Sequence, residues 1–161
     1  LGEAVEPILE ALQAASPNRF RGVRRAATWD PHPDVENRAE KGLLATEDFK
    51  TGAQLLVSKG LILENTIYFP QLPELAAFAN TVPDLTIVLN HIGGLYRVGP
   101  YANRDNEVLP EWQSGITAVA GCPNIYLKLG GVGQPRYGFD WHTWDKPIGS
   151  EDLSSRKPCL L

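Results

Sequence analysis

The sequence alternates between amphipathic segments and short β-rich runs, and this alternation restricts the fold more than any other feature. Apolar residues at helical spacing predict four helices, and short apolar runs bounded by Pro, Gly or Asp predict four strands. Alternating elements with short connections favour parallel strands joined by right-handed crossovers. The predicted helices cover residues 3–15, 46–60, 74–81 and 107–120, and the predicted strands cover residues 20–27, 61–68, 86–91 and 125–129.

Four such units without a glycine-rich dinucleotide fingerprint indicate part of a (β/α)8 barrel rather than a nucleotide-binding sheet. Eight units need about 250 residues, whereas this chain has 161 residues and no methionine. We therefore expect residues 1–161 to form a single partial TIM-barrel domain of the α/β class, truncated at both ends. Pro110 is expected in the first turn of the last helix, where a proline is tolerated.

Composition excludes several classes of protein. The formal net charge is −4, so the chain has no basic footprint for binding nucleic acid. No apolar run approaches the roughly 18 residues of a membrane span. Cys122 and Cys159 form no CxxC motif and no evident disulfide framework, which favours a reducing, cytoplasmic location. The expected partner is a small-molecule substrate.

The third predicted strand ends in Asn90-His91, and Gly93-Gly94 follows closely. In parallel α/β sheets and barrels, ligands and catalytic groups lie at the carboxyl ends of the strands. His91 is therefore the leading candidate for a catalytic residue. A histidine that only closes the strand through a hydrogen bond in the loop explains the position equally well, and both interpretations stay open.

Charged residues also occur in the other predicted strands. Arg24 and Arg25 lie near the end of the first strand, and strand alternation points one of them inward. An arginine in a barrel mouth suits a substrate carboxylate, which it can bind bidentately. An ion pair with Glu64 on the next strand is the structural alternative. Lys128, at the end of the fourth strand, can bind substrate or extend its ammonium group into water along a packed stem.

Aromatic loops follow the first and the fourth predicted strands. Trp29 lies in the Pro-rich loop after the first strand, and Trp141 and His142 lie in the aromatic segment after the fourth. These three residues are candidates for substrate binding, with packed or exposed surface side chains as the alternative. The three histidines, His32, His91 and His142, show no HxH or HExxH spacing, so the residues alone give little support for a metal site.

A series of short motifs occurs in a defined order along the chain. The motifs are Gly22-Val23-Arg24, Gly42-Leu43-Leu44, Phe49-Lys50-Thr51-Gly52, Gly60-Leu61, Tyr68-Phe69-Pro70-Gln71-Leu72-Pro73-Glu74-Leu75, Leu89-Asn90-His91-Ile92-Gly93-Gly94, Glu111-Trp112, Pro123-Asn124-Ile125-Tyr126-Leu127-Lys128-Leu129-Gly130-Gly131 and Ser150-Glu151-Asp152-Leu153. Each motif is modest, but the ordered set resembles the amidohydrolase-2 family, metal-dependent TIM-barrel hydrolases that include sugar-lactone and pyrone-dicarboxylate lactonases. The resemblance extends from about Phe20 to Leu153.

The resemblance implies a distorted (β/α)8 barrel to which this chain contributes about strands 3 to 6. It also implies a hydrolase that opens a lactone, or a related ester or amide bond, of a small carboxylate or sugar acid with an activated water. His91 would be the fifth-strand histidine, which is a metal ligand in metal-using members and polarises the substrate in metal-free members. The resemblance places Arg24 in the substrate-binding mouth and allows a divalent, zinc-like metal as cofactor.

The sequence departs from the family pattern at positions that matter for catalysis. The first-strand His-x-His pair and the eighth-strand aspartate, the expected general base, are absent from this chain. Phe69 stands where family members commonly have a histidine, and a phenyl ring neither ligates metal nor transfers a proton. We therefore expect the 161-residue chain alone to be inactive.

Two alternatives to a lactonase stay open at this point. One is a decarboxylase on the same barrel, and the other is a non-catalytic remnant that acts as an interaction module. A half barrel leaves strand edges unpaired and apolar helix faces bare, which predicts homo-oligomers or other self-association through the open edges.

Overall fold

The computed structural model describes residues 2–155, and these residues form four parallel strands that alternate with helices. The sheet order β1-β2-β3-β4 follows the chain, and each neighbouring pair is parallel. The α/β class and the predicted alternation are therefore confirmed. The strands are β1 (Gly22–Ala26), β2 (Ile62–Thr66), β3 (Ile87–Leu89) and β4 (Ile125–Leu127).

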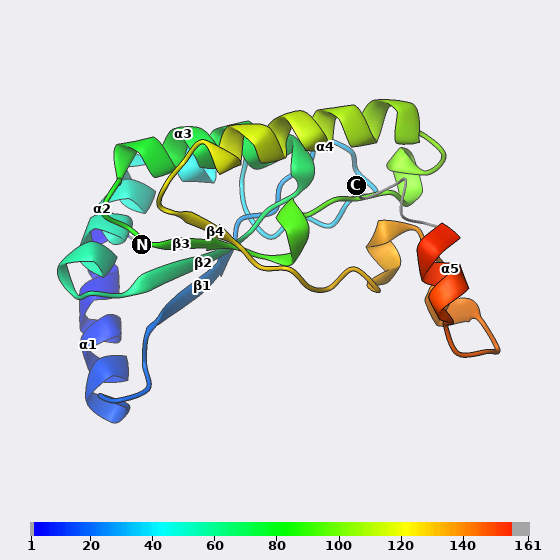
Figure 1. Cartoon of the computed structure of the whole chain (residues 1–161). Helices are drawn as coiled ribbons and strands as arrows, with labels where there is room; N and C mark the ends of the chain where they lie inside the picture. Colours follow the sequence, from blue (N-terminus) through cyan, green and yellow to red (C-terminus); the bar gives the residue numbers. More distant parts are fainter. Residues whose placement is uncertain (1, 156–161) are drawn as a thin grey trace.

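The long helices α3 and α4 lie side by side along one face of the sheet (Figure 1). The short helix α5 lies beyond the ends toward which the strands point, next to the loop that follows β4 (Figure 1). No helix within residues 2–155 is long and apolar enough to cross a membrane. The helices are α1 (Glu6–Ala15), α2 (Glu47–Ser58), α3 (Leu72–Thr81), α4 (Asp105–Ala120) and α5 (Ser150–Ser155).

The helix start predicted at Thr46 is confirmed, whereas α3 and α4 each begin two residues earlier than predicted. The Thr46 hydroxyl accepts a hydrogen bond from the Phe49 amide at 3.2 Å, as an N-cap residue should. Helix α4 begins at Asp105, so the prediction that Pro110 lies in its first turn is wrong. Arg97 holds the Asp105 carboxylate, with 2.8 Å between Nε and Oδ1, and an acidic group favours the positive end of a helix.

The two faces of the sheet differ in burial. Leu63, Ile87 and Leu89 are almost completely buried and belong to the core, which also includes residues of the helices. The alternating positions, among them Glu64 and Val88, are only half-buried. Because successive side chains of a strand point to opposite faces, the sheet has a covered face and a more open inner face.

Strands β1 and β4 form the edges of the described sheet, since each pairs with one neighbour within residues 2–155. Large apolar side chains are exposed at the β4 edge, where Tyr126 is 61% and Leu129 is 82% exposed. Unpaired edges next to exposed apolar side chains promote association between chains.

We expect the 161-residue chain to self-associate through its open sheet edges. Replacing Leu127 and Leu129 with lysine should reduce association, because charged side chains oppose the pairing of edge strands. The measurement is molar mass by size-exclusion chromatography with light scattering. Ile8→Lys, at an exposed apolar position of α1, is the matched control, and a monomeric unmodified chain would contradict the prediction.

Candidate active site

The chain makes a left-handed turn directly after β3. His91, Ile92, Gly93 and Gly94 all have positive φ angles, at 51°, 48°, 78° and 66°. A left-handed conformation costs roughly 1–2 kcal/mol for each residue with a side chain, whereas glycine adopts it freely. The two glycines are therefore a local requirement of the turn, and His91 and Ile92 carry the conformational cost.

Buried contacts from distant parts of the chain hold this turn. The Trp112 indole donates to the Ile92 carbonyl at 2.9 Å, and the Tyr137 hydroxyl donates to the His91 carbonyl. A Cβ atom at Gly94 would lie 1.8 Å from the carbonyl oxygen of Ile67, so the backbone of the turn directly contacts the residue that follows β2. Strained residues that are held in this way occur preferentially at functional sites.

The His91 ring lies half-buried against the loop that follows β4. A Cβ atom at Gly131 would lie 2.7 Å from His91 Nδ1, and this nitrogen is buried without a hydrogen bond of normal geometry. Burial lowers the pKa of His91, and the positive charges of Arg136, Arg24 and Lys128 lower it further. His91 is therefore neutral near pH 7, the form in which imidazole binds metals and donates to uncharged oxygen atoms.

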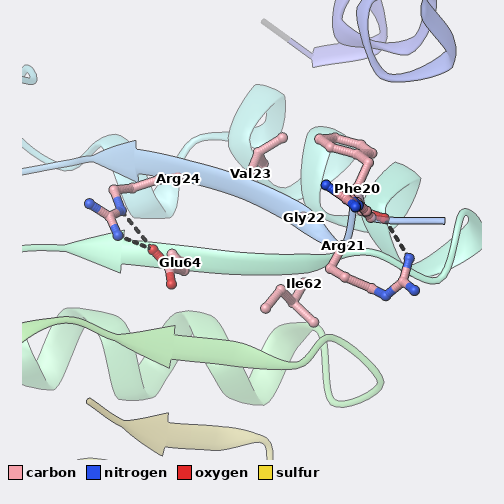
Figure 2. Close-up of a pocket in the computed structure, with 8 residues that line it drawn as sticks. Phe20, Arg21, Gly22, Val23, Arg24, Ile62 and Glu64 are labelled. Atoms are coloured by element: carbon pink, nitrogen blue, oxygen red, sulfur yellow. Dashed lines mark hydrogen bonds and ion pairs between the residues drawn. The ribbon is translucent and has the colours of Figure 1, made fainter. Parts of the chain in front are cut away.

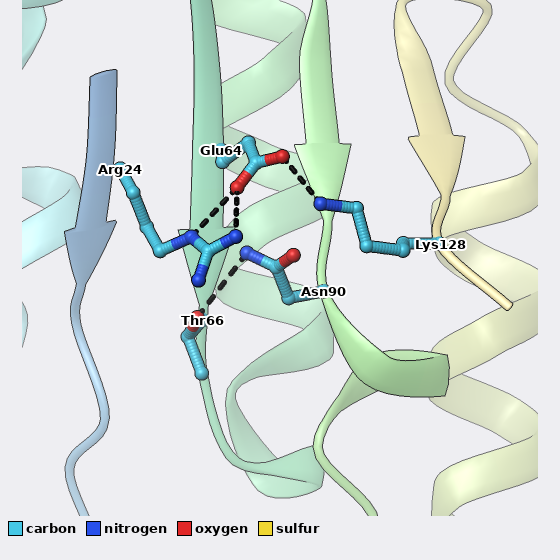
Figure 3. A network of polar contacts seen from close by, with 5 residues as sticks. All are labelled: Arg24, Glu64, Thr66, Asn90 and Lys128. Atoms are coloured by element: carbon cyan, nitrogen blue, oxygen red, sulfur yellow. Dashed lines mark hydrogen bonds and ion pairs between the residues drawn. The ribbon is translucent and has the colours of Figure 1, made fainter. Parts of the chain in front are cut away.

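Two cations share one carboxylate on the inner face of the sheet, where side chains from β1, β2 and the end of β4 meet (Figure 3). Arg24 contacts Glu64 Oε2 through Nε at 2.6 Å and through Nη2 at 2.5 Å, and the Lys128 ammonium donates to Oε1. Lys128 and, to a lesser degree, Arg24 lower the pKa of Glu64. The cluster thus contains two positive charges and one negative charge.

The structure shows which contacts Arg24 and Lys128 make within the chain. Arg24 makes the ion pair with Glu64 that was its structural alternative, and Lys128 binds the same carboxylate rather than only reaching water. The Arg24 side chain still is 58% exposed. The cluster can therefore attract an anion electrostatically, although the main hydrogen-bonding edge of Arg24 is already occupied.

Asn90 lies one step nearer the carboxyl ends of the strands. Its side-chain amide donates to the Thr66 hydroxyl at 3.3 Å (Figure 3), while its Oδ1 atom is buried and has no hydrogen-bond partner within residues 2–155. Thr28, in the loop after β1, also has a buried hydroxyl without a partner. Buried polar atoms are normally hydrogen-bonded, so such atoms at one end of a sheet are consistent with a binding site.

A cavity of about 430 Å³ opens over β1 and β2. It extends from Phe20 and Arg21, at the start of β1, to Arg24 and Glu64 (Figure 2), and it does not include His91. The chemistry at the carboxyl ends of the strands, rather than this open groove, therefore defines the candidate site.

The loop residues predicted to bind substrate take different positions. The Trp29 amide donates to Gln71 Oε1 at 2.9 Å, and the Lys41 ammonium lies 5.2 Å from the centre of its ring. The Trp141 ring stacks on Phe139 at 4.4 Å, and its Nε1 atom is buried without a partner. His142 is exposed.

Several residues that support the site were not found from the sequence. Gln71 accepts from the Trp29 and Tyr68 amides and donates to the Ala27 carbonyl, so it joins the ends of β1 and β2. Trp112 and Tyr137 hold the left-handed turn from sites distant in sequence. No local pattern marks these roles, because each depends on a contact across the fold.

The described residues do not fit a metal centre. No group of three or more His, Cys, Asp or Glu side chains within residues 2–155 is arranged to hold a metal ion. Phe69 is buried and packs edge-on against Tyr101, with ring centres 5.3 Å apart. Because catalytic zinc usually takes three protein ligands, His91 alone cannot form such a site.

A family model described as "Amidohydrolase" matches residues 2–151 of this chain. The chain belongs to the amidohydrolase-2 family. A curated relative from Sinorhizobium fredii, the uncharacterized protein y4mH, is 25% identical over 120 residues. That match covers 74% of this chain and 38% of the relative.

Solved structures agree with this family at the level of the fold. An amidohydrolase from Burkholderia multivorans, crystallised with bound HEPES, has a TM-score of 0.68 and 23% sequence identity, and the match covers 96% of this chain and 49% of that one. A zinc-bound crystal form of an amidohydrolase from the same organism has a TM-score of 0.67 and 23% identity, and the match covers 99% of this chain and 51% of that one. The chain thus corresponds to about half of an amidohydrolase TIM-barrel chain.

Gly94→Ala should destabilise the protein far more than Gly60→Ala. Both glycines have positive φ, but a Cβ atom at Gly60 meets nothing within 4 Å, whereas at Gly94 it meets the Ile67 carbonyl. We expect Gly60→Ala to cost roughly 1 kcal/mol and Gly94→Ala to cost several times as much or to prevent folding. Urea unfolding midpoints measure the difference, and equal midpoints would refute the proposed close contact.

The stability of the protein should depend on the protonation of His91. Because its pKa is lowered in the folded state, the unfolded chain binds the proton more tightly, and the free energy of unfolding falls as the pH drops from about 7 to about 5. His91→Asn should remove this contribution, since asparagine tolerates positive φ but does not titrate. Urea titrations at each pH give the measurement, with His32→Asn as control; an unchanged slope in His91→Asn would count against it.

Proposed function

We propose that this chain supplies the central part of a hydrolase site that opens a lactone, or a related ester or amide bond, of a small carboxylate or sugar acid. The observation that carries the proposal is the strained left-handed turn, which holds a neutral His91 at the carboxyl end of a parallel strand. Membership of the amidohydrolase-2 family supports the reaction class. The cations Arg24 and Lys128 lie on the inner face of the same sheet.

His91 acts on the carbonyl group of the substrate. A neutral imidazole can donate a hydrogen bond to the carbonyl oxygen and stabilise the negative charge that develops when water attacks. Fixing His91 in a strained turn keeps this donor in place before the substrate binds, which reduces the cost of reorganisation during the reaction.

Charge on the inner face favours an anionic substrate. The cluster of Arg24, Glu64 and Lys128 has one more positive than negative charge, and its arginine is exposed. Such a field raises the local concentration of small anions. Trp141 and the aromatic segment around it provide a wall on the side of β4.

The general base that activates water is not among His91, Arg24 and Lys128. Glu64 is a poor candidate, because Lys128 and Arg24 lower its pKa and a weakly basic carboxylate accepts a proton from water inefficiently. Residues 2–155 also lack the ligands of a metal site, although a relative from Burkholderia multivorans was crystallised with zinc. The 161-residue chain alone should therefore show no turnover.

We expect His91→Asn to reduce lactone hydrolysis by the protein expressed from its own gene by at least about a hundredfold in kcat, the scale of losing one oxyanion donor. The measurement is acid release from a panel of sugar-acid lactones, followed with a pH indicator. His32→Asn changes a half-buried histidine in the loop after β1, outside the turn that holds His91, and is the matched control.

Three outcomes would contradict this proposal or the expectations attached to it. Unchanged turnover in His91→Asn would remove the residue from the chemistry. Release of carbon dioxide without addition of water would identify a decarboxylase on the same barrel. Hydrolysis by the 161-residue chain alone would contradict the expected need for residues beyond it.

A further inference from the structure

Arg136 carries a pair of unused hydrogen-bond donors in the loop after β4. Its Nε and Nη2 atoms are both buried, and neither has a hydrogen-bond partner among residues 2–155. A buried donor without a partner costs roughly 1–3 kcal/mol, and more when the group is charged. The guanidinium group remains charged in proteins, so this arrangement needs an explanation.

The two unused atoms form one edge of the guanidinium group, and the same edge binds carboxylates elsewhere in this chain. Arg97 uses Nε and Nη2 to hold Asp105 at 2.8 and 2.5 Å. Arg104 uses the same two atoms to hold Glu107 at 3.2 and 2.6 Å. This fork matches the two oxygens of a carboxylate, and in Arg136 neither of its atoms is paired within residues 2–155.

The backbone around Arg136 is fixed and lies beside His91. The Arg136 carbonyl accepts from the Arg97 amide at 2.8 Å, and the next residue, Tyr137, is fully buried and donates to the His91 carbonyl. The Arg136 guanidinium carbon lies 5.5 Å from the centre of the Tyr137 ring. Arg136 is also the largest single charge effect on the pKa of His91, ahead of Arg24 and Lys128.

We propose that the Nε and Nη2 fork of Arg136 binds a carboxylate group of the substrate next to His91. This inference rests on the proposed function and makes it more specific. The Nε and Nη2 atoms of Arg24 already bind Glu64. Arg136 is then the bidentate anchor, while Arg24 and Lys128 contribute only to the general attraction of anions. Arg136 is half-buried as a residue, although its Nε and Nη2 atoms are themselves buried.

Binding of gluconate tests the proposal without any need for turnover. Addition of gluconate to ¹⁵N-labelled protein should shift the Arg136 Nε–H resonance, whereas sorbitol, which has no carboxylate, should not. Arg136→Gln should weaken gluconate binding by about tenfold or more, the scale of a charge-assisted hydrogen bond. Arg136→Lys should restore only part of the affinity, because lysine keeps the charge but loses the fork.

Variants of other arginines show whether a loss of gluconate binding is specific to Arg136. Arg21→Gln removes an exposed arginine that contacts only backbone carbonyls, and it should leave gluconate binding unchanged. Arg24→Gln should weaken binding less than Arg136→Gln, and the reverse order would overturn the proposal. The proposal is also overturned if gluconate leaves the Arg136 Nε–H resonance unshifted and Arg136→Gln lowers the stability of the protein. That result would show that a carboxylate of the protein itself binds the Nε and Nη2 atoms.

The outcome is distinguishable from failure of the proposed function. Loss of gluconate binding in Arg136→Gln together with unchanged turnover in His91→Asn keeps the anion site and rejects the hydrolytic role of His91. Loss of turnover in His91→Asn together with unchanged gluconate binding in Arg136→Gln keeps that role and rejects the anion site.

Discussion

The left-handed turn after β3 is the constraint on which the arrangement of this site depends. Its backbone touches the Ile67 carbonyl at the end of β2, and its carbonyl groups accept from Trp112 of α4 and from Tyr137 of the loop after β4. The turn therefore joins three segments that are distant in sequence. In return, those buried contacts offset the cost of holding a histidine and an isoleucine at positive φ.

Electrostatics on the inner face follows from strand register. Arg24 on β1 is paired in register with Glu64 on β2, and Lys128 comes directly after β4, so all three side chains reach one point from different strands. Sharing a carboxylate between two cations keeps Glu64 ionised and leaves positive charge in excess. The same arrangement limits what Arg24 can do, because its fork is occupied, and it makes Arg136 the more available group for a carboxylate.

Much of the fold and part of the site could be predicted from the sequence. Helical periodicity and short apolar runs identified all four strands, and Thr46 was correctly expected to begin a helix. The start of α4 was predicted two residues too late, because the pairing of Arg97 with Asp105 is a contact that periodicity does not contain. The substrate-binding roles of Trp29, Trp141 and His142 stay predictions.

What the sequence determined by itself is local: the order of helices and strands, the need for glycine at the turn, and the position of His91 at the end of a buried strand. These features depend on neighbours within a few residues, through side-chain periodicity and backbone sterics. Only the tertiary structure decided that Glu64 binds both Arg24 and Lys128 and that Tyr137 and Trp112 support the turn. It also decided that the Nε and Nη2 atoms of Arg136 are buried without a hydrogen-bond partner in residues 2–155. Each of these contacts joins atoms that are far apart in the sequence, and the spacing of residues along the chain does not determine the distance between such atoms.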